Sequence, residues 1–158
     1  MDVYFSVDPE ATSDLQEARE FLKFLQAQGH TVYRAPYVLS DSPSTFLREQ
    51  FGLTKEQSCT EQREMHLRWI DDSDLLVADI TAPSEGMWVI IQRALDKAAM
   101  GLNKTPVILI KNKNKQRRFG KIVRGLIESD KVAYCEYASI NEVARKWPEL
   151  LEKALQAK

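Results

Sequence analysis

Short apolar runs alternate with helix-like segments along this chain, and this alternation constrains the fold more than any other feature. Five such runs stand out: Asp2–Val7, His30–Ala35, Asp74–Ile80, Thr105–Lys111 and Lys131–Tyr137. Apolar runs of this length, separated by helices, are typical of parallel strands that are covered on both faces. The sequence therefore predicts an α/β fold with a five-stranded parallel sheet, doubly wound in a flavodoxin-like or Rossmann-like way, with helices on both faces.

The segments between the apolar runs carry signals of helix ends and loops. Three pairs of residues have the spacing of capping boxes at helix starts: Ser13 with Gln16, Thr54 with Gln57, and Ser139 with Glu142. Gly29 and Gly101 are placed to end helices, and Pro148 predicts a kink or a division in the last helix. The stretch Tyr37–Leu53 is rich in Ser, Pro and Asp, which predicts a long loop.

Composition narrows the class of protein. With 158 residues, 44% of them apolar, the chain suits one domain over residues 1–158. A net charge of -1 gives no field that would attract nucleic acid, and no apolar run is long enough to span a membrane. The N-terminus shows no secretory signal pattern, and Cys59 and Cys135 have no metal-ligand spacing and fit a reducing compartment. We expect a cytoplasmic protein, with the nucleus as the alternative location, that uses no cofactor and no metal.

Ligands of an open parallel sheet bind at the carboxyl ends of the strands, near the point where the strand order reverses. The residues that we expect to bind a ligand there are Phe5, Ser6, Asp79, Ser84, Glu85, Gly86 and Trp88. Ser84 and Gly86 could present a hydroxyl and backbone amides to an anion at a helix N-terminus. The alternative is that Ser84 only caps the helix and Gly86 only permits the turn.

The run WIDDSDLLVADITAPSEGMWVIIQRALDKA, which begins at Trp69, resembles the nucleoside 2-deoxyribosyltransferase family. It is most similar to the branch that hydrolyses the N-glycosidic bond of deoxynucleoside 5'-monophosphates. A second similarity is KIVRG, Lys121–Gly125, which matches the family's M-I-R-G segment. The resemblance covers residues 1–137, with its specific part in the central thirty residues. It implies a five-stranded parallel sheet, a nucleoside or nucleotide ligand, and a homodimer in which a neighbouring subunit helps to close the pocket.

The chain departs from the family pattern at the residues of the chemistry. Ile90 stands at the position of the family's catalytic Glu, Trp88 at that of a Gly, and His66 at that of an Asp. The family's Gly-containing phosphate loop falls on a segment with Asp8 and Glu10. Glycosidic cleavage needs a carboxylate beside an oxocarbenium-like transition state, and losing one electrostatic stabiliser costs roughly 10²–10³ in rate. We therefore expect a protein that is inactive in the family reaction, keeps a nucleoside or nucleotide pocket, and has Trp88 filling part of it.

Two other functions stay open. The first is an active N-glycosidase or deoxyribosyltransferase with a relocated carboxylate from Glu85, Asp79 or Glu64, and with His66 as acid or base. Each carboxylate also has a simpler interpretation: Glu85 as a solvated charge at a helix N-terminus, Asp79 as an acceptor for backbone amides, and Glu64 as part of a solvated helix face. The second is a protein-interaction scaffold that uses the Tyr37–Leu53 loop.

The basic tract Lys111–Arg118 could bind the phosphate of a nucleotide or of a nucleic acid. No aromatic residues are interleaved in it to stack on bases, and the net charge of the chain is close to zero. A solvated loop is therefore the favoured interpretation of the tract.

Overall fold

The computed structural model describes residues 1–8, 15–33, 38–39, 49, 52, 55–115 and 119–157. The strands are β1 (Asp2–Ser6), β2 (Thr31–Tyr33), β3 (Leu75–Asp79), β4 (Val107–Asn112) and β5 (Ala133–Tyr137). The helices are α1 (Leu15–Ala27), α4 (Lys55–Asp72), α5 (Glu85–Asp96), the short 3-10 helix η1 (Ala98–Met100), α6 (Lys121–Ile127) and α7 (Ile140–Gln156). The strands form one sheet in the order β2-β1-β3-β4-β5, and every neighbouring pair is parallel. This order is the flavodoxin-like one, which confirms the predicted fold class.

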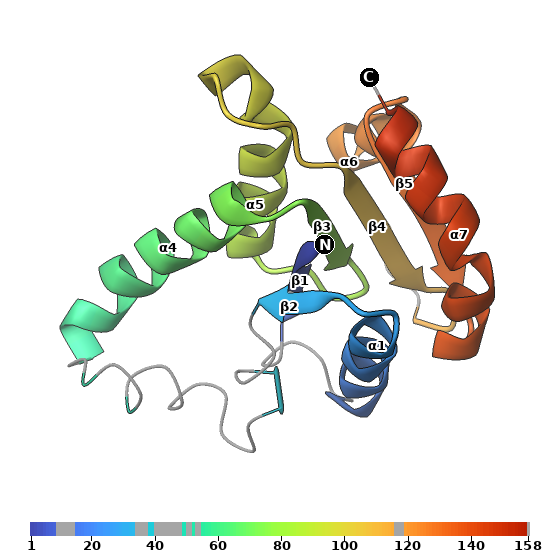
Figure 1. Cartoon of the computed structure of the whole chain (residues 1–158), viewed down its shortest axis with the longest axis horizontal. Helices are drawn as coiled ribbons and strands as arrows, with labels where there is room; N and C mark the ends of the chain where they lie inside the picture. Colours follow the sequence, from blue (N-terminus) through green and yellow to red (C-terminus); the bar gives the residue numbers. More distant parts are fainter. Residues whose placement is uncertain are drawn as a thin grey trace.

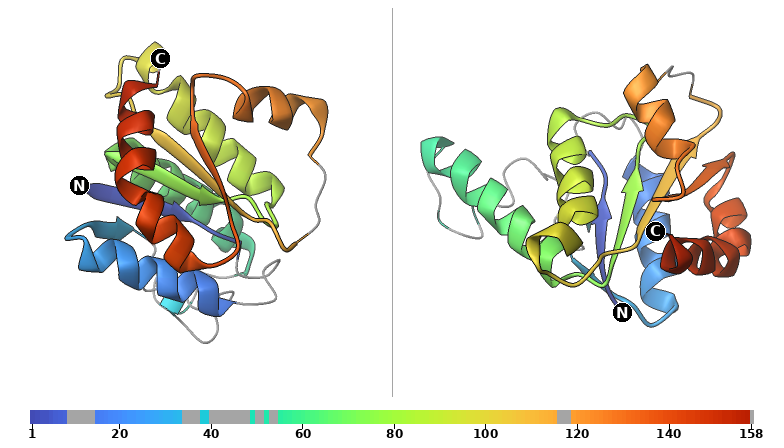
Figure 2. Two further views of the ribbon diagram at one scale, coloured as in Figure 1. Left: turned by 90° about the vertical axis from the view of Figure 1, so that its right-hand side faces the viewer. Right: turned by 90° about the horizontal axis from the view of Figure 1, so that it is seen from above.

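Helices cover both faces of the sheet. Helices α1 and α7 lie on one face, and α4, α5 and α6 lie on the other (Figure 1). In the right-hand view of Figure 2, the strands lie between α4 and α5 on one side and α1 and α7 on the other. Each face has its own cluster of buried apolar side chains, because neighbouring residues of a strand point to opposite faces.

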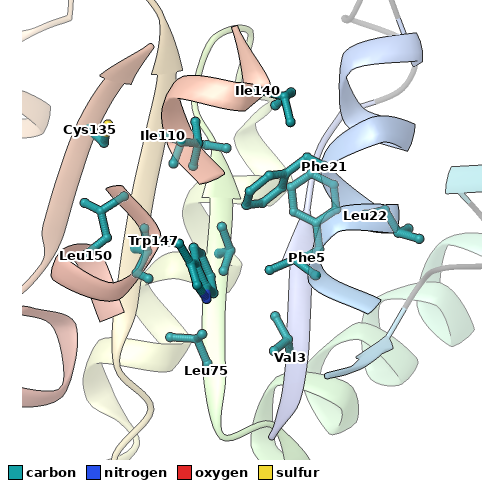
Figure 3. Packing of buried hydrophobic residues seen from close by; sticks show 14 of the residues in the cluster. Val3, Phe5, Phe21, Leu22, Leu75, Ile110, Cys135, Ile140, Trp147 and Leu150 are labelled. Atoms are coloured by element: carbon teal, nitrogen blue, oxygen red, sulfur yellow. The ribbon is translucent and has the colours of Figure 1, made fainter. Parts of the chain in front are cut away.

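Strand β1 shows how this alternation divides its residues between the two faces. Val3 and Phe5 belong to the cluster under α1 and α7, whereas Tyr4 belongs to the cluster under α4 and α5. Figure 3 shows Phe5 directed toward Phe21 of α1, and the ring centroids of these two residues are 5.2 Å apart. The burial of a side chain of this size stabilises the fold by roughly 1.5–3 kcal/mol, so the face that Phe5 occupies is strongly fixed.

Helix α7 is a single element although it contains Pro148. Its buried side chains recur at helical spacing and form one continuous stripe against the sheet: Ile140, Val143, Trp147, Leu150 and Ala154. The sequence predicted either a kink or a division at Pro148, and the helix is not divided there. Its N-cap, Ser139, makes no side-chain capping bond, and the Glu142 carboxylate instead accepts a hydrogen bond from the Ala138 amide at 2.9 Å.

The predicted helix ends at two glycines are confirmed. Gly29 follows α1 with φ 79°, and Gly101 follows η1 with φ 76°, a left-handed conformation that favours glycine. The capping pairs that involve Ser13 and Thr54 lie outside the residues or side chains that the structure describes, and so does most of the Tyr37–Leu53 stretch. Within the described residues, no helix is long and apolar enough to cross a membrane.

A buried lysine holds the amino-terminal edge of the sheet, opposite to the edge where ligands bind. The Lys97 side chain is fully buried, and its ammonium donates to the carbonyls of Ile70 (3.0 Å), Asp71 (2.8 Å) and Ser73 (3.3 Å) and to Oγ1 of Thr105 (2.5 Å). Ile70 and Asp71 lie in the last turn of α4, whose carbonyls lack partners within the helix. Burial lowers the pKa of Lys97, while the surrounding acceptors hold its protons in place.

Candidate functional site

A cavity of about 500 Å³ lies between the carboxyl end of β1, helix α4 and the start of α5. Its lining residues are Tyr4, Ser6, Val7, Asp8, Gln62, Arg63, His66, Leu67, Ser84, Gly86, Met87, Val89 and Ile90. The cavity is next to the β1–β3 pair, where the order of the strands reverses. A doubly wound sheet binds its ligands at this point, and the volume is within the range of small-molecule sites.

Strand β1 supplies alternate residues to the cavity wall. Tyr4 and Ser6 face the cavity, and Asp8 lines it just beyond the end of the strand. Phe5 was predicted to bind the ligand, but it lies on the opposite face, in the core under α1 and α7. The prediction placed both Phe5 and Ser6 at the site, and two neighbouring residues of a strand cannot face the same side. The aromatic residue that β1 contributes to the cavity is therefore Tyr4.

Helix α4 contributes one face of its surface to the cavity. Gln62, Arg63 and His66 line the wall together because residues three and four apart share a helix face. The Tyr4 hydroxyl lies 2.8 Å from Nδ1 of His66, which joins β1 to α4 at the inner part of the cavity. The tautomer of the imidazole decides which of the two groups donates in this hydrogen bond. Glu64, two residues before His66, does not line the cavity, and its carboxylate lies 2.6 Å from Nη1 of Arg63.

The first turns of α5 form the third wall. Ser84, Gly86, Met87 and Ile90 line the cavity, and the Ile90 side chain is only 8% exposed. Ser84 occupies the N-cap position without a side-chain capping bond, and Gly86 has no positive φ. Ser84 therefore does not cap the helix through its side chain, and the turn at Gly86 does not need the conformational freedom of glycine.

Two predicted site residues of the same segment lie away from the cavity. Glu85 is exposed at the first position of α5 and is not among the lining residues. Trp88 is half-buried against the core of this face and does not fill the cavity as predicted. The apolar start of α5 is explained by packing, since Met87, Ile90 and Ile91 are buried in the same core.

Asp79 lies at the carboxyl end of β3 but on the face of α1 and α7, outside the cavity. Its carboxylate accepts hydrogen bonds from the Thr81 amide (2.9 Å) and from the Tyr137 hydroxyl (3.0 Å). Burial raises the pKa of Asp79 and, together with the Asp79 charge, that of Tyr137. Asp79 thus has the structural role that the simpler interpretation gave it, as an acceptor for a backbone amide.

The charged groups of the cavity differ from those that the sequence indicated. Of Glu85, Asp79 and Glu64, none lines the cavity, and among the described lining residues the carboxylate is that of Asp8. No group of three or more metal-binding side chains exists within the described ranges. Helical and strand periodicity would have found the missed residues, because Tyr4 is two residues before Ser6 and Met87 is three before Ile90.

The basic tract is partly tied to carboxylates of neighbouring elements. Lys111 Nζ lies 3.3 Å from Oε1 of Glu136 in β5, and Lys113 Nζ lies 3.4 Å from Oε2 of Glu142 in α7. Residues 116–118 are outside the described part of the chain. The start of the tract is therefore engaged in intramolecular ion pairs.

We compared the sequence and the fold with those of known proteins. No protein-family model matches the chain, and no match is found among curated proteins. The chain is similar to the solved structure of the Clostridium botulinum CMP N-glycosidase, BcmB, with a TM-score of 0.57 and 22% sequence identity. The similarity covers 94% of this chain and 99% of that one. The two proteins share a fold. At this identity, the likeness supports the α/β architecture, and the cavity residues have to be interpreted from their own chemistry.

Proposed function

We propose that this protein is a divergent nucleoside 2-deoxyribosyltransferase-like protein that binds a nucleoside or nucleotide and does not cleave its glycosidic bond by the family reaction. The observation that carries this proposal is Ile90. It lines the cavity at the position where the family that the sequence resembles has its catalytic Glu. An aliphatic side chain offers neither a nucleophile nor a negative charge to an oxocarbenium-like transition state.

The walls of the cavity support a ligand of this type. Tyr4 and His66 provide aromatic surface and hydrogen-bonding groups at the inner part, next to the apolar side chains of Leu67 and Ile90. The hydroxyl of Ser6, which is 2% exposed, makes no hydrogen bond within the described part of the chain. A buried polar group that the protein leaves unsatisfied is a natural contact for a bound hydroxyl or base edge.

A second candidate function is an active N-glycosidase or deoxyribosyltransferase, and one observation favours it. The Asp8 carboxylate and the His66 imidazole line the same cavity. In such an enzyme Asp8 would stabilise the developing positive charge of the sugar, and His66 would protonate the leaving base.

We further propose that the protein acts in the cytoplasm, and that it forms a homodimer, as the resemblance implies. The support is the exposed apolar surface of α6, where Ile122 is 90% exposed within the KIVRG segment. Light scattering after size-exclusion chromatography tests this association, and a monomeric mass at high protein concentration would contradict it. A protein-interaction scaffold without a small-molecule ligand is the remaining alternative.

The function is tested by separating binding from turnover. The purified full chain is incubated with each deoxynucleoside and each deoxynucleoside 5'-monophosphate, while thermal shift reports binding and chromatography reports the free base. We expect a higher melting temperature with at least one compound and no sustained release of base.

Catalytic release of base that is abolished in Asp8→Asn and retained in Glu85→Gln would establish the second candidate instead. The absence of any thermal shift or turnover at millimolar concentrations would favour the scaffold.

A further inference from the structure

A second hollow, of about 310 Å³, lies between helices α4 and α5 and the short helix η1. Among the described residues, the lining of this α4–α5 hollow is Arg63, Leu67, Val89, Gln92, Arg93, Asp96 and Met100. Three of them, Arg63, Leu67 and Val89, also line the cavity, so the two spaces adjoin along these side chains. The α4–α5 hollow therefore extends the candidate site along α5, away from the amino end of that helix.

The charged groups around the α4–α5 hollow are bonded within the protein. The Arg93 guanidinium donates two hydrogen bonds to the Asp71 carboxylate, at 2.8 and 2.6 Å. Gln92 Nε2 donates to the Asp96 carboxylate at 2.9 Å, and Arg63 is paired with an acid of its own helix. Because these charges already have protein partners, apolar contact is the main interaction that the α4–α5 hollow provides to a ligand.

Apolar side chains form the exposed part of the α4–α5 hollow. Val89 is 50% exposed and Met100 is 52% exposed, and Leu67 lies half-buried beside the cavity. Nη1 of Arg93 donates to Sδ of Met100 at 2.9 Å, which holds this side chain at the hollow. The volume is at the lower end of the range for small-molecule sites, so it suits one ring or a short chain.

We propose that the site takes a ligand of two parts. The polar part, of the nucleoside type, lies in the cavity, and an apolar group attached to it, an aromatic ring or a short acyl chain, lies in the α4–α5 hollow against Val89 and Met100. This inference rests on the proposed function for the polar part. It deepens that function by adding an apolar subsite and the side chains that recognise its occupant.

The four methionines of the chain provide a readout for each part of the site. Met87 lines the cavity and Met100 lines the α4–α5 hollow, whereas Met1 and Met65 are not among the described lining residues of either. The full chain is labelled with ¹³C in the methionine methyl groups. Spectra are then recorded with each deoxynucleoside and with derivatives that carry a benzyl group on the base or on the 5'-oxygen.

We expect a deoxynucleoside that binds to shift the Met87 signal, and at least one of its benzyl derivatives to shift the Met87 and Met100 signals together. By titration calorimetry, that derivative should bind at least about tenfold more tightly than its parent. The burial of roughly 60 Å² of apolar surface suffices for a gain of this size. Benzyl alcohol alone, at millimolar concentration, should shift the Met100 signal and leave that of Met1 in place.

Two variants locate the source of the gain. Met100→Gln keeps the length of an exposed side chain and makes it polar, so the gain from the benzyl group should fall below about threefold while the affinity of the parent stays unchanged. Leu102→Gln is the matched control, because Leu102 is apolar and 40% exposed but is not a lining residue of the α4–α5 hollow. It should keep the gain of the wild-type protein. The wild-type spectra test the inference even where a variant fails to fold.

The outcomes separate this inference from the function beneath it. Benzyl derivatives that bind no more tightly than their parents and leave the Met100 signal in place would overturn the inference, with the proposed function still standing. A dimeric mass that Met100→Gln abolishes would also overturn it, because a second copy of the chain would then cover the α4–α5 hollow. If no compound of the set shifts the Met87 signal or binds, the proposed function itself fails. A Met100 signal that benzyl alcohol shifts would then still support the apolar subsite, and an unshifted one would overturn it.

Discussion

Two groups of buried polar side chains lie at opposite edges of the sheet, and they differ in how completely their hydrogen bonds are satisfied. At the amino edge, the Lys97 ammonium donates to three backbone carbonyls and to Thr105, and the Thr105 hydroxyl donates to the Ser73 carbonyl at 3.1 Å. At the carboxyl edge, Ser6 is equally buried but faces a cavity, and its hydroxyl has no such bond in the described part of the chain.

This difference separates a structural cluster from a binding site. A buried polar network whose members are all satisfied stabilises one conformation and leaves nothing for a ligand to bond. A polar group without a protein partner beside a cavity gives the fold little stability, but it offers a hydrogen bond that a ligand can complete. On this basis, the cluster at the amino edge stabilises the fold, and we propose the carboxyl edge as the binding site.

The largest expected effect comes from breaking the amino-edge cluster at Lys97. Lys97→Met keeps the length of the side chain but removes the donor of the Asp71 carbonyl and of Thr105 Oγ1, which should lower the free energy of unfolding by about 3 kcal/mol. Urea denaturation measures the free energy of unfolding. The control is Lys23→Met, an exposed lysine of α1, which should change the stability by less than about 0.5 kcal/mol. Similar values for the two variants would contradict a structural role for Lys97.

A smaller effect is expected from Thr105 in the same cluster. Thr105→Val keeps the shape of the side chain and removes a hydroxyl that both accepts from Lys97 and donates to Ser73. The free energy of unfolding should fall by about 1–2 kcal/mol, with no change in ligand affinity. A loss of affinity without a loss of stability would contradict the division between the two edges.

Asp79 provides a pH-dependent comparison, since it lies at the carboxyl edge but has its partners. Burial raises the pKa of Asp79 above its ordinary value of 3.8, so the folded protein holds this proton more tightly than the unfolded chain does. The resulting stability is fully present below pH 3.8 and is lost as the pH rises through the raised pKa. Asp79→Asn cannot ionise, and its stability relative to the wild-type protein should therefore improve with rising pH.

Urea denaturation at several pH values measures this trend. Glu142, whose pKa the Ala138 amide lowers to about 2, has the opposite pH dependence, but it is present in both proteins and cancels in the difference. A difference between the two proteins that stays constant with pH would show that Asp79 is not the group responsible.

The smallest effect on stability is expected at the cavity. Ser6→Ala removes a hydroxyl that has no protein partner within the described residues, so the free energy of unfolding should stay within about 0.5 kcal/mol of the wild-type value. The affinity of the Ser6→Ala variant for the proposed nucleoside or nucleotide ligand should fall, and titration calorimetry measures this affinity. A destabilisation as large as that of Thr105→Val would mean that Ser6 belongs to a satisfied network.

Much of this fold was predictable because the signals are local. Periodicity, backbone conformation and sheet topology predict the five strands, the glycines after α1 and η1, and a cavity at the carboxyl edge. The same periodicity, applied strictly, would have selected Tyr4 in place of Phe5, since Ser6 was already assigned to the cavity side.

The sequence by itself determined the order of the elements and the fold class. Only the tertiary structure decided which acidic side chain lines the cavity. Asp8, Asp79 and Glu85 all follow or flank strand ends, but one lines the cavity, one is buried on the other face and one is exposed. The physical reason is that pairing in the sheet and packing of α4 and α5 fix the direction of each side chain in space, and these contacts join residues more than sixty positions apart, such as Tyr4 and His66.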